Sequence, residues 1–134
     1  MMKLKVFISQ PMAGLTDKEI LERREQLIEM TKHWFCDDAL EFIDSFTKSE
    51  DIVGRGRIAM LGDSIAMMHD ANLVVFASGW NKSAGCKVEH EVCVQYNIRR
   101  MYEDGMTEHY ESPKQKLADS YKGDLSASAK YYWG

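Results

Sequence analysis

The run Leu73 to Ala77 (LVVFA) is apolar at every position and is followed by a polar turn at Ser78 to Lys82. A strand with one face in water alternates apolar and polar side chains, whereas a strand covered on both faces can be apolar throughout. The run therefore predicts the central strand of a parallel β-sheet that has helices on both faces.

The chain before this central strand alternates between strand and helix patterns. Leu4 to Ser9 predicts a strand, which Gln10 to Gly14 ends because this segment holds a proline and a glycine. Thr16 to Glu19 has the form of a capping box, and apolar residues then recur at helical spacing, which predicts a helix of about 17 residues. Glu41 to Phe46 predicts a second, weaker strand.

The remaining segments repeat this alternation. Val53 to Arg57 is a basic, glycine-bearing loop, and Ile58 to Met68 shows a helical period. Ser83 can cap a helix that runs to about Asn97, and Arg100 to Glu103 predicts a short final strand. The predicted fold class is therefore α/β, with a single doubly wound (flavodoxin-like or Rossmann-like) parallel sheet of about four to five strands and flanking helices.

The predicted domain covers residues 1–103, and residues 104–134 form a polar tail that ends in Tyr131 to Trp133. Two alternatives are open for this tail: a mobile segment, or one that docks on the domain or on a neighbouring subunit. In a doubly wound sheet, ligands bind beyond the carboxyl ends of the strands. The expected site loops are Gln10 to Gly14, Val53 to Arg57 and Ser78 to Ser83.

The composition is typical of one globular domain. The 134 residues carry a net charge of -4, which argues against a broad basic surface and therefore against nucleic-acid binding. The first residues have no signal-peptide pattern, and no segment reaches the roughly 18 apolar residues that a membrane helix needs. A cytoplasmic protein with no membrane partner is expected.

No metal or other cofactor is expected. The cysteines Cys36, Cys86 and Cys93 lack C-x-x-C spacing, and the four histidines lack ligand spacing, so neither a disulfide framework nor a zinc site is predicted. No P-loop and no Gly-x-Gly-x-x-Gly occurs, so no nicotinamide cofactor is implied. We expect Cys86 and Cys93 to be packing residues, because no basic partner is evident for either thiol.

Glu89 is the residue that a purely structural interpretation does not explain. On a helical wheel it lies in the middle of the apolar stripe that includes Gly85, Cys93 and Tyr96. A buried carboxylate needs a partner or a purpose, because burying an unpaired charge costs several kcal/mol or shifts the pKa. Two explanations are open: a structural ion pair, with Arg24, which lies on the apolar stripe of its own helix, or with another buried base; or a chemical role.

Three groups of residues together resemble a known family. They are the pattern FISQPM-x-G from Phe7 to Gly14, Asp63 in the second helix, and GW-x-x-S-x-G-x-x-x-E from Gly79 to Glu89. In order and spacing they are similar to the small bacterial and phage branch of the nucleoside 2-deoxyribosyltransferase superfamily, to which the deoxynucleotide N-hydrolases are related. The resemblance spans residues 4–103. It implies that Glu89 attacks the anomeric carbon of a deoxyribose, and that Asp63 lies near Glu89 and handles a proton at the base.

N-glycosidic cleavage suits these residue types. Positive charge develops on the sugar, so a carboxylate such as Glu89 can stabilise it or bond to the anomeric carbon. The base leaves more easily when it is protonated, which requires a second carboxyl group of raised pKa on the base side. The resemblance assigns this role to Asp63, whose place at the margin of an apolar face also fits a solvated surface residue.

Ser83 bears on the identity of the substrate. It stands at a helix start, where free backbone amides and the helix dipole favour an anion such as a 5′-phosphate. In the resembling family, transferases for free nucleosides usually have an aspartate here, whereas the deoxynucleotide N-hydrolases have a serine that contacts phosphate. The resemblance therefore favours a nucleoside monophosphate, and a simple N-cap role for Ser83 stays open.

Further substrate-binding residues are expected around Glu89 and Ser83. They are Gln10, Pro11, Met12 and Gly14, which would cradle the sugar or base or form a simple turn, together with Phe7, Trp80, Gly85 and Arg57. Trp80 either stacks on a base or plugs its loop, and Arg57, with Arg55, either reaches a phosphate or is solvated. Phe7 replaces a tyrosine that is frequent in the transferases, so a hydroxyl group that would orient the glutamate is missing.

The sequence thus predicts an enzyme that hydrolyses, or transfers the base across, the N-glycosidic bond of a deoxyribonucleoside or its 5′-monophosphate. A non-catalytic nucleotide-binding module, a sensor or sponge, is the alternative, and the missing tyrosine favours it. The presence of both Asp63 and Glu89 favours the enzyme, because a pure binder gains little from two acids that face an anionic ligand. Cleavage of another N-riboside stays open. The resemblance also implies a homo-oligomer whose partner is a small-molecule nucleoside or nucleotide.

Overall fold

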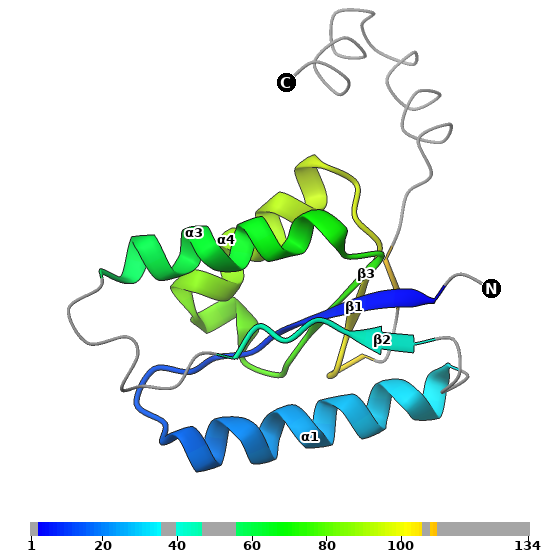
Figure 1. Ribbon diagram of the computed structural model, residues 1–134, viewed down its shortest axis with the longest axis horizontal. Coiled ribbons are helices and arrows are strands. Elements are labelled where there is room, and N and C mark those ends of the chain that lie inside the picture. The colour runs from blue at the N-terminus through cyan, green and yellow to red at the C-terminus, as the bar shows by residue number, and fades with distance from the viewer. Residues whose placement is uncertain (1–2, 36–39, 47–55, 106–107, 110–134) are drawn as a thin grey trace, which may run out of the picture.

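A five-stranded β-sheet forms the centre of the protein (Figure 1). The computed structural model describes residues 3–35, 40–46, 56–105 and 108–109. In sheet order the strands are β2 (Leu40–Phe42), β1 (Leu4–Ser9), β3 (Leu73–Phe76), β4 (Arg100–Tyr102) and β5 (Glu108–His109). The first four strands run parallel to one another, and β5 pairs antiparallel with β4.

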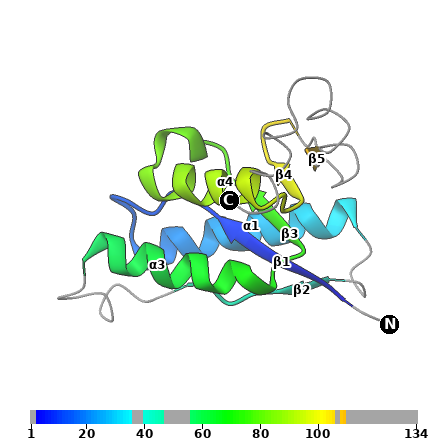
Figure 2. The same ribbon diagram turned by 90° about the horizontal axis from the view of Figure 1, so that it is seen from above.

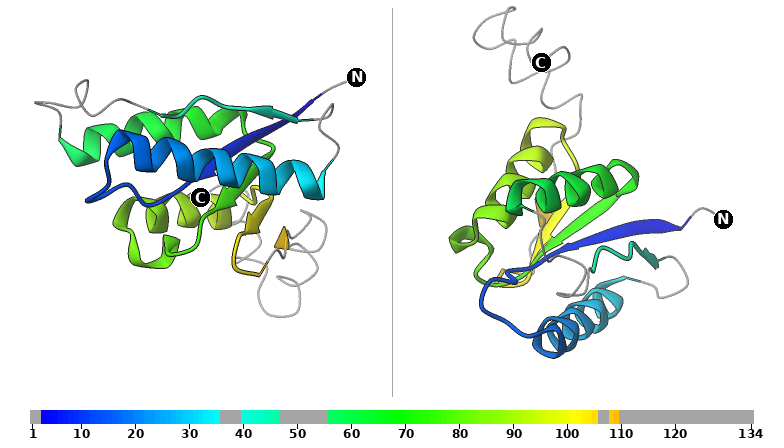
Figure 3. Two further views of the ribbon diagram at one scale, coloured as in Figure 1. Left: turned by 90° about the horizontal axis from the view of Figure 1, so that it is seen from below. Right: turned by 60° about the vertical axis from the view of Figure 1, so that its left-hand side comes forward.

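The helices lie on both faces of this sheet (Figures 1 and 3). The helix α1 (Asp17–Trp34) covers one face, and the helices α3 (Arg57–Met67) and α4 (Ala84–Gln95) cover the other. Two short 3-10 turns, η2 (Met68–Asp70) and η3 (Trp80–Lys82), precede β3 and α4. Figure 2 shows α3 and α4 side by side, with β1 visible between them. The prediction of a doubly wound parallel sheet is confirmed.

Each face of the sheet has its own hydrophobic core. On one face Ile8 packs in a cluster with Leu27 of α1, and on the other Phe7 packs in a cluster with Cys93 of α4. Strand β3 is buried at every position, as expected for a strand covered on both sides. Because successive strand residues point to opposite faces, Ser9 points to the same face as Phe7, toward α4.

The edges of the sheet differ from the prediction. Strand β2 is shorter than the predicted strand from Glu41 to Phe46, because regular pairing with β1 ends at Phe42. The Ile43 N–H then still donates to the Val6 carbonyl at 2.8 Å. Residues 108–109, which belong to the predicted tail, form the antiparallel strand β5. The rest of that tail, including Tyr131 to Trp133, lies outside the described residues.

Both predicted helix caps are present. Thr16 Oγ1 accepts a hydrogen bond from the Glu19 N–H, and Glu19 Oε1 accepts one from the Thr16 N–H, each at 3.2 Å. This reciprocal pair is the capping box that the sequence predicts. At the start of α4, Ser83 Oγ accepts from the Cys86 N–H at 3.3 Å. The start of α1 and that of α4 are thereby fixed.

The last turn of α4 corrects one prediction. The helix ends at Gln95 rather than at about Asn97, since Asn97 takes a left-handed φ of 54°, which a helix cannot continue. Tyr96, which the wheel places on the buried stripe, is 69% exposed because it lies beyond this helix end. Burial on α4 instead falls on Cys86, Glu89 and Cys93.

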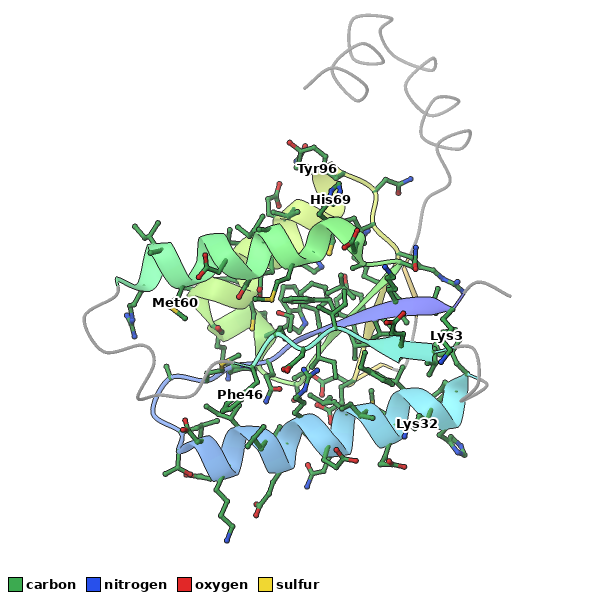
Figure 4. The ribbon with its side chains drawn as sticks, viewed as in Figure 1. Lys3, Lys32, Phe46, Met60, His69 and Tyr96 are labelled. Carbon is green, nitrogen blue, oxygen red and sulfur yellow. The ribbon has the colours of Figure 1, made fainter. Side chains whose placement is uncertain are left out.

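The helices begin at the carboxyl edge of the sheet, where the parallel strands end. In Figure 4 the side chains of Phe46 and Met60 lie toward this edge, whereas Lys3 and Lys32 lie toward the opposite edge. Within the described ranges, no helix is both long enough and apolar enough to cross a membrane.

Candidate active site

The side chain of Glu89 extends from the helix α4 to the carboxyl end of β1. Its residue is 7% exposed, and its Oε1 accepts a hydrogen bond of 2.8 Å from the hydroxyl of Ser9, the last residue of β1. Strand β1 stands between β2 and β3. The chain therefore passes from β1 to β2 on one side and then crosses back to β3 on the other side. This is the topological switch point of the sheet, where doubly wound proteins bind their ligands.

The environment of Glu89 sets its protonation. Burial raises the pKa of Glu89 to about 7, and the hydrogen bond from Ser9 opposes this increase. The carboxyl group is therefore poised between its neutral and ionised forms near neutral pH. A carboxyl group whose pKa is raised to near neutral pH, at the carboxyl ends of parallel strands, is a candidate general acid, general base or nucleophile.

Arg24 does not neutralise Glu89, so the ion-pair explanation is wrong. Its guanidinium donates to the Ile43 carbonyl at 2.7 Å and to Ser45 Oγ at 3.5 Å. The helix α1 that carries Arg24 covers the face of the sheet opposite to α4 (Figure 3). Among the described residues, burial raises the pKa of Glu89, the hydrogen bond from Ser9 lowers it, and no cation contributes.

Two buried thiols adjoin the carboxyl group of Glu89. Burial raises the pKa of Cys86, although hydrogen bonds with the hydroxyls of Ser83 and Ser9 oppose this. Burial also raises the pKa of Cys93 to about 12. Both thiols therefore stay protonated at neutral pH, which makes them poor nucleophiles and agrees with a packing role. Ser83, Cys86, Ser9 and Glu89 form one connected polar cluster, which we call the Glu89 cluster.

The loop after β1 is held in place by its own contacts. The buried Gln10 side chain donates from Nε2 to the Ile20 carbonyl at 3.1 Å, which ties the loop to α1. Pro11 lies against Gly79: a Cβ atom added at Gly79 would stand 3.8 Å from the Cγ atom of Pro11. Met12 is exposed, and Gly14 has a positive φ of 79° that favours glycine. The Gln10 amide is therefore engaged in structure, and Pro11 lies near the turn that leads to Ser83.

The predicted residues of α3 are exposed. Asp63 is exposed on α3 and is not among the described groups that shift the pKa of Glu89. Arg57 is exposed at the first position of α3, and Arg55 lies outside the described residues. Gly85 does pack close to α3, since a Cβ atom there would stand 3.9 Å from Leu61 Cδ1. The structure thus brings together Glu89, Ser83 and the loop after β1, and Gly85 packs against the α3 helix that carries Asp63.

Trp80 belongs to an aromatic cluster on the β4 side of α4. Its ring stacks on His90, with centroids 4.1 Å apart and planes at 23°, and lies 5.5 Å from the ring of Phe76. His90 Nε2 and the Tyr102 hydroxyl also share a hydrogen bond. One face of the indole is therefore covered by protein, which supports the plug interpretation of Trp80. Phe7 is likewise a core residue, 1% exposed.

A second carboxylate, Glu103, fixes the turn that leads to Ser83. It accepts a hydrogen bond of 2.7 Å from the Ser78 N–H and an ion-paired hydrogen bond from the Arg23 guanidinium. Burial raises the pKa of Glu103, but these donors lower it more, so it lies below its usual value. Glu103 thus connects β4, α1 and the turn after β3.

Ser9 and Glu103 are neighbours of the candidate site that the sequence interpretation missed. Ser9 stands inside the quoted pattern, two residues after Phe7 and therefore on the same face of the strand. A polar residue on that face, at the end of an otherwise apolar strand, was the available signal. Glu103 offered no such signal, because its partners lie 25 and 80 residues away in the chain.

No family model, no curated protein and no solved structure matches this chain. Within the described residues, no three histidine, cysteine or acidic side chains are grouped as metal ligands would be. The Glu89 cluster is therefore the feature from which a function can be argued.

Proposed function

We propose that this protein cleaves the N-glycosidic bond of a deoxyribonucleoside or its 5′-monophosphate, by hydrolysis or base transfer, with Glu89 as the nucleophile. The observation that carries the proposal is the Glu89 carboxyl group itself. It is buried at the switch point of the sheet, is held by Ser9 and has a pKa of about 7. The resemblance of residues 4–103 to the deoxyribosyltransferase superfamily supports the same role.

The proposed reaction has two steps. A carboxylate oxygen of Glu89 bonds to C1′ of the sugar while the C1′–N bond breaks, and the bonding electron pair leaves with the base nitrogen. The base takes up a proton, a role that the resemblance assigns to Asp63. Water then attacks C1′ of the glycosyl ester and passes a proton to the carboxylate of Asp63, while the bond between C1′ and the Glu89 oxygen breaks and releases the sugar and the Glu89 carboxylate. If a second base attacks instead of water, the outcome is base transfer.

The start of α4 supports a phosphorylated substrate. Ser83 is half-buried and caps a helix of 12 residues, whose first N–H groups and dipole favour an anion. Glu89 lies on the same helix, so a 5′-phosphate near Ser83 would bring the sugar toward this carboxyl group. We further infer from the resemblance that the enzyme works in the cytoplasm as a homo-oligomer.

The test is release of free base from a panel of substrates. The four deoxyribonucleosides and their 5′-monophosphates are incubated with the protein, with and without an added acceptor base, and the products are separated by chromatography. We expect free base from at least one monophosphate, and the same rate from Glu91→Gln, which changes an exposed carboxylate of α4. No release, combined with nucleotide-dependent thermal stabilisation, would instead identify a binding module.

Ser83→Asp separates the phosphate role from the cap role. Aspartate caps helices as well as serine does, so α4 should keep its N-terminus. Its negative charge should repel a 5′-phosphate, and we expect turnover of the monophosphate to fall about tenfold relative to that of the free nucleoside. The measurement is kcat/KM for the matched pair of substrates. An unchanged ratio would show that Ser83 serves as a cap and does not contact phosphate.

A further inference from the structure

We propose that Ser9 is a positioning residue for Glu89: its hydroxyl holds Oε1 of the carboxyl group and leaves Oε2 as the oxygen that reacts. The catalytic part of this inference rests on the proposed function. The contact itself can be tested without any substrate.

The backbone fixes Ser9 firmly. It is the last residue of β1 and pairs with Phe76 of β3, and its carbonyl accepts from the Ala77 N–H at 2.9 Å. The residue is 1% exposed, so its side chain is held between the sheet and α4. The donor to Glu89 therefore comes from the central part of the sheet, where positional freedom is least, and not from a loop.

The single proton of the Ser9 hydroxyl has one strong acceptor. Ser9 Oγ donates to Glu89 Oε1 at 2.8 Å, and the same hydroxyl lies near the Cys86 thiol, whose pKa it lowers. A carboxylate oxygen is a much stronger acceptor than sulfur, so the hydroxyl proton goes to Oε1 of Glu89. The protonated thiol of Cys86 can donate in turn to a hydroxyl oxygen of its cluster. Oε1 is thereby occupied, and Oε2 keeps its lone pairs for a substrate.

Few other groups compete with Ser9 for control of Glu89. On α4 the titratable neighbours are the thiols of Cys86 and Cys93, and Arg100 of β4 acts on Cys93. On the strands, the face toward α4 carries Phe7, Val74 and Phe76 near the core, with Lys5 at the far end of β1. On α3, Arg57 and Asp63 are exposed. Within the part of the chain that the structure describes, Ser9 is thus the polar group that donates to the carboxyl oxygen.

Ser9→Ala tests the contact through the titration of Glu89. The carboxyl carbon of Glu89 is followed by carbon-13 NMR, with Glu89→Gln used to assign its signal. Removing the hydroxyl donor should move the midpoint of this titration to higher pH by about one pH unit. Ser9→Thr keeps the hydroxyl and should restore the original midpoint. If Ser9→Ala folds poorly, Ser9→Cys replaces it: the thiol is close in size to the hydroxyl but a weaker donor, so the midpoint of the Glu89 titration should again move to higher pH.

The kinetic readout separates positioning from general stability. We expect Ser9→Ala to lower kcat about 10- to 100-fold with little change in KM, and to move the acidic limb of the pH–rate profile to higher pH. The control is Thr31→Val, which removes another buried hydroxyl, one that donates to the Leu27 carbonyl at 2.7 Å in α1. It should reduce stability without moving the profile.

Each outcome decides one point. If the Glu89 titration is the same in Ser9→Ala as in the native protein, the positioning role is wrong, whatever the activity. If the titration moves but no substrate is turned over, the contact stands and the proposed function fails. If Thr31→Val moves the pH–rate profile as Ser9→Ala does, the effect is structural and the inference is overturned.

Discussion

Glu89→Gln should make the protein more stable at about pH 8, by about 3 kcal/mol, and leave its stability at about pH 4 nearly unchanged. The reason is the rise in the pKa of Glu89 from 4.5 to about 7 on folding. Between these values the folded state binds the proton more tightly than the unfolded chain does, so stability falls as pH rises. Above about pH 7 the full cost of the buried charge is present. Glutamine removes that charge and can still accept from Ser9.

Urea unfolding followed by circular dichroism, at several pH values across this range, measures the effect. Glu91→Gln is the matched control, because Glu91 is exposed on the same helix and accepts from Gln95 at its surface. Its stability should follow the native pH dependence within about 0.5 kcal/mol. If Glu89→Gln shows the same pH dependence as the native protein, then Glu89 is not a group of raised pKa.

The same substitution should remove turnover. If Glu89 forms the bond to C1′, its replacement by the neutral, weakly nucleophilic amide of glutamine should lower kcat at least about 10³-fold. Native turnover should rise with pH through about 7, because the ionised carboxylate is the attacking form. Initial rates of base release, measured on folded protein across the pH range, test both expectations.

Residual activity above about a tenth of the native rate in Glu89→Gln would contradict a nucleophilic role, since a covalent step cannot tolerate this loss. A gain in stability combined with a loss of turnover is typical of a residue kept for function at the expense of stability. A gain in stability with no substrate found would leave Glu89 as an unpaired charge that is still without a reaction.

Local patterns in the sequence were enough to predict most of the fold. The apolar run of β3, the capping box at Thr16 and the cap at Ser83 each depend on residues within a few positions of one another. The burial of Glu89 followed from the period of its helix. The position at which α4 ends was not predicted, because a helical wheel does not show where the backbone turns left-handed, as it does at Asn97.

The partners within the site could not be predicted in the same way. A wheel shows that Arg24 and Glu89 both lie on apolar stripes, but it does not show which face of the sheet each stripe covers. The connection order of the strands decides that, and it places α1 and α4 on opposite faces. The contact between Ser9 and Glu89 depends likewise on the tertiary packing of residues that are 80 positions apart.

The bridge through Glu103 has a consequence for the order in which the protein is assembled. Arg23 and the Ser78 amide lie early and midway in the chain, and the carboxylate that joins them comes only after β4. During synthesis from the N-terminus, α1, β3 and α4 can form before residue 103 has left the ribosome. The turn before Ser83 is then still without its anchor. The turn that leads to Ser83 is thus among the last parts of the described domain to be completed, and a nascent chain that stops short of Glu103 carries Glu89 beside a turn without its anchor.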